Sequence, residues 1–184
     1  MKKTFLLLSI SCSLILAAIT TVISADPAQY IGSSKCKMCH MSAKRGDQFG
    51  KWSNGPHAKA FEVLATEEAK AVAQKAGVQT DPQKAPECLK CHVTAYDAPA
   101  SAKADSYAME EGVGCESCHG PGSLYKTMKI MKDLAAGTQD PEAVSFKAGD
   151  EATCLTCHNE ASPTYKPFNY AEAWKQIEHP VPQE

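Results

Sequence analysis

Four short segments of this 184-residue chain share one arrangement of sulfur and nitrogen side chains. In each segment two cysteines are three positions apart, and a histidine directly follows the second cysteine. Residues i and i+3 lie on one face of a helical turn, so both thiols can reach one edge of a flat ring with the histidine beneath it. Thiols placed in this way can bond to porphyrin vinyl groups, and a neutral imidazole can bind iron, which is typical of c-type haem attachment. The paired cysteines are Cys36 and Cys39, Cys88 and Cys91, Cys115 and Cys118, and Cys154 and Cys157.

Disulfides, a zinc ribbon or a thioredoxin-like redox pair would also account for paired cysteines. None of these requires a histidine after every second cysteine. The four segments use eight of the nine cysteines and four of the six histidines. We therefore predict four covalently bound haem c groups, each with one of the following histidines as its proximal iron ligand: His40, His92, His119 and His158.

Each iron has a second axial position, and only two histidines, His57 and His179, remain to fill these positions. His57 follows a Gly-Pro turn at an expected helix start, and His179 ends an expected short helix, so we predict both as distal ligands. At most two haems can then be bis-histidine, and the others need a different side chain, a ligand from a neighbouring subunit, or an open position. Methionine is the usual substitute and raises the reduction potential, which makes Met128 a candidate. The helical spacing of Met128 and Met131 would equally suit ordinary apolar packing.

The amino terminus has the composition of an export signal. Lys2 and Lys3 precede an apolar run over residues 5–19, and Ala25 offers a small residue for cleavage. A retained membrane anchor is the alternative, because residues 5–23 are nearly long enough to span a bilayer, but three serines interrupt the run. We predict a secretory signal peptide over residues 1–25, cleaved near Ala25, a periplasmic location, and no stable membrane insertion afterwards. Residues 26–184 are predicted to form a single tetrahaem domain.

The length and charge of this mature chain restrict its interior and its partners. About forty residues per haem are too few to build an ordinary aliphatic core beside four macrocycles, so the haems are expected to form the core. Without Lys2 and Lys3 the polypeptide has 17 basic and 21 acidic side chains. This negative balance argues against nucleic acid or an anionic membrane surface as partner, and allows docking to a basic patch on a redox protein.

The remaining sequence favours short helices and irregular segments, with little sheet. Thr66 is a potential cap and Gly77 a stop for a helix at 61–76. Gly137 similarly ends a second helix at 124–134, where apolar residues recur at helical spacing. Other helices are expected at 41–52, from His57 onward, and at 171–178.

Residues 112–122, Gly-Val-Gly-Cys-Glu-Ser-Cys-His-Gly-Pro-Gly, resemble the signature around the third haem of the tetrahaem cytochrome c-554 family. Residues 56–60, Pro-His-Ala-Lys-Ala, are similar to that family's distal-histidine segment, and residues 91–93 to its second site. Motif order and spacing agree from about Tyr30 to His179. The resemblance implies a mainly α, compact multihaem fold with haems in stacked pairs, and a carrier that accepts electrons from hydroxylamine oxidoreductase in ammonia oxidisers.

The resemblance also implies particular iron ligands. It implies His57 as distal ligand of the third haem and His179 of the fourth, with the second haem, held by His92, five-coordinate. The family's first haem takes a histidine roughly ten residues after the third motif, and no histidine lies between His119 and His158 here. Met128 would then substitute, or the first haem would be open too.

Three functions remain to be distinguished. The first is electron transfer between a donor and an acceptor redox protein. The second is an enzyme that uses an open iron to reduce or oxidise nitric oxide, nitrite or hydroxylamine, with Tyr96 and Asp97 near His92 in sequence. The third is a homo-oligomeric haem filament in which neighbouring subunits donate the missing ligands.

Overall fold

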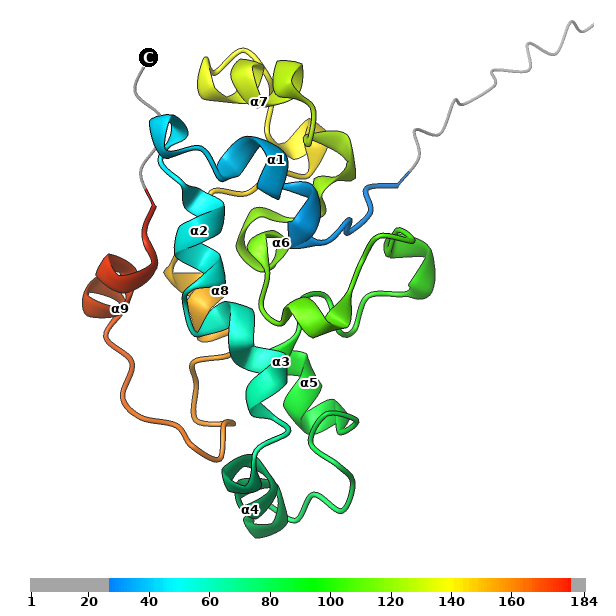
Figure 1. Ribbon diagram of the computed structural model, residues 1–184, viewed down its shortest axis with the longest axis vertical. Helices are drawn as coiled ribbons and strands as arrows, with labels where there is room; N and C mark the ends of the chain where they lie inside the picture. The colour runs from blue at the N-terminus through cyan, green and yellow to red at the C-terminus, as the bar shows by residue number, and fades with distance from the viewer. Residues whose placement is uncertain (1–26, 180–184) are drawn as a thin grey trace, which may run out of the picture.

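The computed structural model describes residues 27–179, so the predicted signal peptide and its cleavage site lie outside the described residues. Within this range the chain forms helices joined by turns (Figure 1), and β-pairing is limited to an isolated parallel bridge between Tyr30 and Lys103. The mainly α fold class is therefore confirmed. The longest described helix has nine residues, so none of the described helices could cross a bilayer.

The α-helices are short and follow the spacing of the four motifs. In chain order they are α1 Lys37–His40, α2 Gln48–Ser53, α3 Ala60–Val63, α4 Glu67–Lys75, α5 Pro86–His92, α6 Cys115–His119, α7 Met128–Ala135, α8 Glu151–Leu155 and α9 Tyr170–Ile177. Single 3-10 turns lie between them, namely η1 Ser33–Lys35, η2 Ala43–Arg45, η3 His57–Lys59, η4 Ala100–Ala102, η5 Met109–Glu111, η6 Gly122–Leu124 and η7 Glu142–Val144.

One expected helix is divided in two and another begins later than predicted, for the same physical reason. The stretch 61–76 is two helices, α3 and α4, because Thr66 is extended (φ −72°, ψ 154°) and its hydroxyl accepts the Ala69 N–H as the cap of α4. Thr127 likewise caps α7 through the Ile130 N–H, so this helix starts at Met128 rather than at 124. An N-cap residue has non-helical backbone angles, so a helix cannot run through it. The predicted stops hold, since Gly77 and Gly137 both have positive φ.

Two further predicted helices differ in extent. The stretch 41–52 contains η2 followed by α2, separated by Gly46 in the left-handed region. The helix expected over 171–178 is α9, which starts at Tyr170 after the Asn169 side chain accepts the Glu172 N–H. His57 opens η3, at the helix start predicted for it.

The aliphatic core is small for the length of the chain. Eight hydrophobic residues of the described part are buried, and no large side chain there is completely enclosed. The main cluster joins Leu64, beside α3, to Leu89 and Val93 at α5, and these two helices lie side by side (Figure 1). A chain of this size normally buries much more apolar surface, so such a core suits a protein whose interior is supplied by prosthetic groups.

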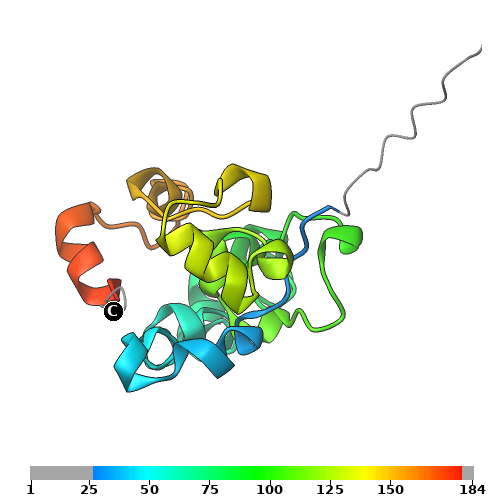
Figure 2. The same cartoon turned by 90° about the horizontal axis from the view of Figure 1, so that it is seen from above.

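Helices mark both ends of the long axis, and α9 lies to one side of the other helices. In Figure 1, α1 and α7 lie at one end of the long axis and α4 lies at the other. A long irregular segment after α8 carries α9 to one side, where Figure 2 shows it apart from the main body. The Lys51 ammonium group donates to the Glu178 carbonyl, which ties the end of this segment back to α2.

Candidate functional site

Each motif forms a tight helical turn, as the spacing of its cysteines requires. The first motif comprises Cys36, the N-cap residue of α1, and α1 itself, and the second and third motifs lie in α5 and α6. The fourth begins in α8 and continues into a turn in which the His158 N–H still donates to the Cys154 carbonyl at 2.9 Å. All eight motif cysteines are free thiols rather than disulfides. The sulfur atoms of each motif are therefore available on one face, next to the following histidine. We refer to these as the first to fourth sites.

Contacts between cysteines show which sites adjoin one another. The thiols of Cys36 and Cys115 share a hydrogen bond that raises the pKa of Cys36, which brings the first site beside the third. Burial, together with the neighbouring Cys157, raises the pKa of Cys91 to about 11, which brings the second site beside the fourth. Burial also raises the pKa of Cys118 to about 11, with Cys154 as the next cause, so the third and fourth sites adjoin. The four sites thus form one continuous series: first, third, fourth, second.

Backbone carbonyls orient two of the motif histidines. His92 Nδ1 lies 2.6 Å from the Ala60 carbonyl oxygen, and His119 Nδ1 lies 2.9 Å from that of Lys147. A carbonyl can only accept, so Nδ1 must carry the proton in both rings. Nε2 is then left unprotonated and able to bind a metal, as in other metal-ligating histidines. His40 Nδ1 lies 3.4 Å from Gln48 Oε1, a weaker contact of the same kind.

The two remaining histidines each pack against a motif histidine, but with the opposite partners to those that the family resemblance implied. The ring centre of His57 lies 6.2 Å from that of His158, and the ring centre of His179 lies 5.8 Å from that of His119. The structure therefore places His57 beside the fourth site and His179 beside the third, whereas the resemblance implied the reverse. Sequence spacing does not reveal this, because the long segment before α9 carries His179 past the fourth site.

These distances fit one iron between two imidazoles. With a metal–nitrogen distance of about 2 Å on each side, the two ring centres would lie about 6 Å apart. Burial lowers the pKa of His57 and of His179, and the neighbouring histidines His158 and His119 lower them further. Both rings are therefore held in the neutral form that binds iron. Aromatic rings support the motif partners, Phe146 stacking on His119 and Phe168 on His158.

The first and second sites differ from the other two. Within residues 27–179, no second histidine ring packs against that of His40 or His92. Met128 is the first residue of α7, 46% exposed, at the same end of the molecule as α1 (Figure 1). Its role as ligand remains a prediction. Nearby, the buried Tyr125 hydroxyl donates to the Gly120 carbonyl at 2.6 Å, so this tyrosine is engaged in packing.

A site for a bare metal ion is not formed by the described residues. Nowhere in residues 27–179 do three or more histidine, cysteine, aspartate or glutamate side chains gather as they would around one ion. Tyr96, considered for proton delivery beside His92, instead packs against the aliphatic cluster. Its neighbour Asp97 is exposed.

Glu116, which lies between the cysteines of the third motif, has a role that the sequence did not suggest. The residue is 3% exposed, and its carboxylate accepts backbone N–H groups from Ile31 at 2.9 Å, Gly32 at 2.8 Å and Gly122 at 2.6 Å. Burial raises its pKa, although these three donors favour the charged form. The carboxylate therefore fastens the segment before the first motif to the helix of the third motif.

Gly120 directly follows His119 and cannot be replaced without strain. It has φ +76° and ψ 176°, a region reserved for glycine, and a Cβ there would collide with the Ser145 carbonyl oxygen.

We expect Gly120→Ala to lower the unfolding midpoint strongly and to reduce haem content at the third site. Gly137→Ala is the matched control, since Gly137 also has positive φ but has no atom within 4 Å of the added methyl group. That control should cost only about 1–2 kcal/mol of backbone strain. Equal losses in unfolding experiments on both variants would contradict the collision.

Two comparisons with known proteins found similar sequences. The family described as "Cytochrome c554 and c-prime" matches residues 35–120, which contain the first three motifs. The cytochrome c-554 of Nitrosomonas europaea is 33% identical over 183 residues, which cover 86% of this chain and 75% of that protein. A comparison with solved structures found no match.

Proposed function

The chain belongs to the cytochrome c554 family, and we propose that it transfers electrons between redox proteins on four covalently bound haem c groups. We further propose that residues 26–184 form one tetrahaem domain, exported to the periplasm after cleavage near Ala25. Haem c, when bound, supplies an iron that gains or loses one electron. The protein's part is to hold the four sites close together and to control access to each iron.

The observation that carries this proposal is the continuous series of adjoining sites. Cysteines of the first and third, third and fourth, and fourth and second sites are neighbours in space. A protein that bound haem for storage or for one reaction would need no such series. A multihaem carrier can use such a series, because electrons can then enter at one site and leave at another.

The pairing of histidines supports the same function. We propose His57 as the second axial ligand at the fourth site and His179 as that at the third. Two imidazoles on one iron leave no position for a substrate, so these sites are suited to electron transfer alone. A fixed ligand set also limits structural change when the oxidation state changes.

A second function is proposed at the second site, which shares with the first site the lack of a second histidine ring within residues 27–179. His92 faces no other histidine ring in the described part of the chain, so an open iron position there would admit nitric oxide, nitrite or hydroxylamine. Turnover of nitric oxide by the reduced protein, lost when cyanide occupies the open position, would support this activity. Turnover that cyanide leaves unchanged would place the activity elsewhere.

The number of haems and their ligands can be measured together. We expect a pyridine haemochrome assay to find four haems per purified chain, and fewer would contradict the proposal. Low-temperature electron paramagnetic resonance of the oxidised protein should then give two low-spin signals from the third and fourth sites. One high-spin signal would mean that Met128 or another group closes the first site, and two would mean that the first and second sites are both open.

The proposed partners are a donor and an acceptor protein. By analogy with the relative's family, the donor would be an enzyme of hydroxylamine oxidation in the nitrogen cycle. Rapid reduction by a partner protein, without consumption of a small molecule, would support the carrier function. No electron exchange with any redox protein or inorganic redox reagent would overturn it.

A further inference from the structure

The charged side chains of the described residues are unevenly distributed along the chain. Residues 33–51, which surround the first motif, contain five basic side chains and one acidic one, whereas residues 52–179 contain twelve basic and eighteen acidic ones. The single acid, Asp47, accepts the Gly50 N–H and caps α2. The excess positive charge is therefore concentrated at the first site of a chain that is negative as a whole.

Four of these basic groups are exposed on the surface of this region. Within residues 27–179 no carboxylate pairs with any of them, and all are exposed; they are Lys35, Lys37, Lys44 and Arg45. The Lys37 ammonium group lies 5.7 Å from the centre of the Phe49 ring, which holds it against α2. Helix α7, which lies at the same end of the molecule as α1 (Figure 1), carries the exposed residues Lys129 and Lys132, of which Lys129 pairs with Asp133.

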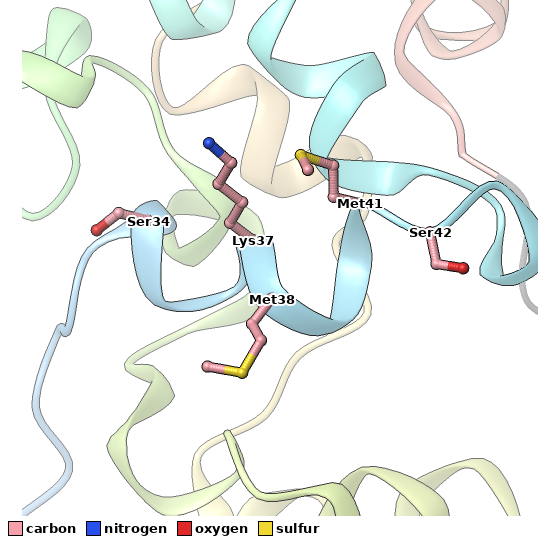
Figure 3. Close-up of a pocket in the computed structure, with 5 residues that line it drawn as sticks. All are labelled: Ser34, Lys37, Met38, Met41 and Ser42. Carbon is pink, nitrogen blue, oxygen red and sulfur yellow. The ribbon is translucent and has the colours of Figure 1, made fainter.

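Apolar side chains are exposed among these charges. Met38 is 92% exposed and Met41 is 53% exposed. With Lys37 and two serines they line an open hollow of about 510 Å³ beside α1 (Figure 3). We name this surface the first-site face; it comprises Ser34, Lys35, Lys37, Met38, Met41, Ser42, Lys44 and Arg45.

The first-site face lies on the side of α1 that points away from its cysteines. At 100° per residue, Met41 is almost opposite the midpoint of Cys36 and Cys39, and Lys37 and Met38 are about 130° from it on either side. A ring bound through the cysteines would occupy the other face of the helix. The methionines and the lysine are thus directed to solvent, within one helical turn of the first site.

We propose that the first-site face docks an acidic redox protein and is the place where electrons pass between this chain and that partner. Two features of this surface select this occupant: unpaired basic groups at the rim and flexible methionines at the centre, which adapt to different partner surfaces. A basic partner would be repelled here, although the negative charge of the whole chain would attract it elsewhere. The inference rests on the proposed carrier function and assigns that carrier a specific entry surface.

Local charge of this kind acts mainly on the rate of association. Complementary potentials raise association rates by roughly 10- to 1,000-fold at low ionic strength, and salt removes the effect. The experiment therefore compares association-limited reduction at several salt concentrations. The probe is an acidic flavodoxin in its hydroquinone form, which gives one electron to one ferric haem and becomes the semiquinone.

Two charge-reversal variants of the haem-loaded protein test the face. Lys37→Glu with Lys44→Glu alters the first-site face, and Lys75→Glu with Lys84→Glu makes the same change in net charge around α4, at the other end of the molecule (Figure 1). At low ionic strength we expect the first pair to lower the second-order rate constant at least about tenfold. The second pair should change it less than about twofold. At high salt all three proteins should converge.

Each outcome separates the inference from the carrier function. Equal effects of both pairs, or no effect of the first pair, would overturn docking at the first-site face while leaving electron transfer intact. No reduction of the wild-type protein by flavodoxin or by dithionite would overturn the carrier function itself. Haem content is measured for every variant. Lys35→Glu with Lys44→Glu, which leaves the motif untouched, replaces the first pair if Lys37→Glu lowers haem attachment.

Discussion

A His57→Ala variant of the haem-loaded protein should show one additional high-spin ferric signal, and one fewer low-spin signal, in low-temperature electron paramagnetic resonance. His57 packs its ring 6.2 Å from that of His158 and is the only other histidine at the fourth site among the described residues. Alanine provides no donor atom, so the iron there would keep His158 alone. Loss of a strong axial ligand also changes the reduction potential of that site.

Exogenous imidazole distinguishes a ligand from a structural residue. If His57 binds iron, millimolar imidazole should enter the space left by His57→Ala and restore the low-spin signal, which a merely misfolded site would not allow. His179→Ala should behave in the same way at the third site, and the effects should add in the double variant because the two pairs are separate. An unchanged number of low-spin haems in His57→Ala would disprove the ligand assignment.

The sequence predicted the chemistry of each motif better than the contacts between motifs in space. The positions of Cys115 and Cys118 on one helical turn follow from their spacing, and α6 has the bounds that this spacing requires. The stops at Gly77 and Gly137 were also predictable, because glycine readily adopts the positive φ that ends a helix. These features depend on residues close together in the chain.

The partners of His57 and His179 could not be predicted in this way. They depend on how the segment after α8 folds back, which is a matter of long-range packing rather than of local pattern. The acceptors for Nδ1 of His92 and His119 are the carbonyls of Ala60 and Lys147, 32 and 28 residues away. Every residue has such a carbonyl, so nothing in the sequence distinguishes these two.

The interruption before α4 and the late start of α7 are smaller differences between the predicted and the observed helices. Thr66 was identified as a potential cap, yet the helix was expected to begin before it. A cap at an interior position and a continuous helix exclude each other, and the cap prevails because its hydroxyl satisfies an N–H that would otherwise lack a partner. Thr127 has the same role in α7, and the apolar spacing across 124–134 concealed it.

Replacing Glu116 by alanine should cost more stability than any other single change among the described acidic residues. Its carboxylate is buried and receives the N–H groups of Ile31, Gly32 and Gly122. Leaving a buried donor without an acceptor costs about 1–3 kcal/mol, and three donors lose their acceptor together. With partial rescue by water, we expect the free energy of unfolding to fall by about 3–5 kcal/mol, measured by urea unfolding at constant haem content.

The position of Glu116 means that the loss should also be seen at the first site. The carboxylate holds residues 31–32, and the hydroxyl of Ser33 next to them accepts the Cys115 N–H at 3.1 Å. Without the carboxylate, the segment leading to Cys36 is no longer fixed against α6. We therefore expect the first site to exchange ligands or lose its spectral signature before the other sites during unfolding.

Two variants separate the buried acceptor from the charge. Glu116→Gln keeps one acceptor oxygen but puts an N–H₂ group where the other oxygen accepts backbone N–H groups, so its loss of stability should be intermediate. Glu110→Ala removes an exposed carboxylate close by in sequence and should change stability by less than about 0.5 kcal/mol. If Glu116→Ala and Glu110→Ala were equally stable, the carboxylate could not be what joins the first and third sites. The adjacency of Cys36 and Cys115 would then have to be maintained by the haem groups themselves.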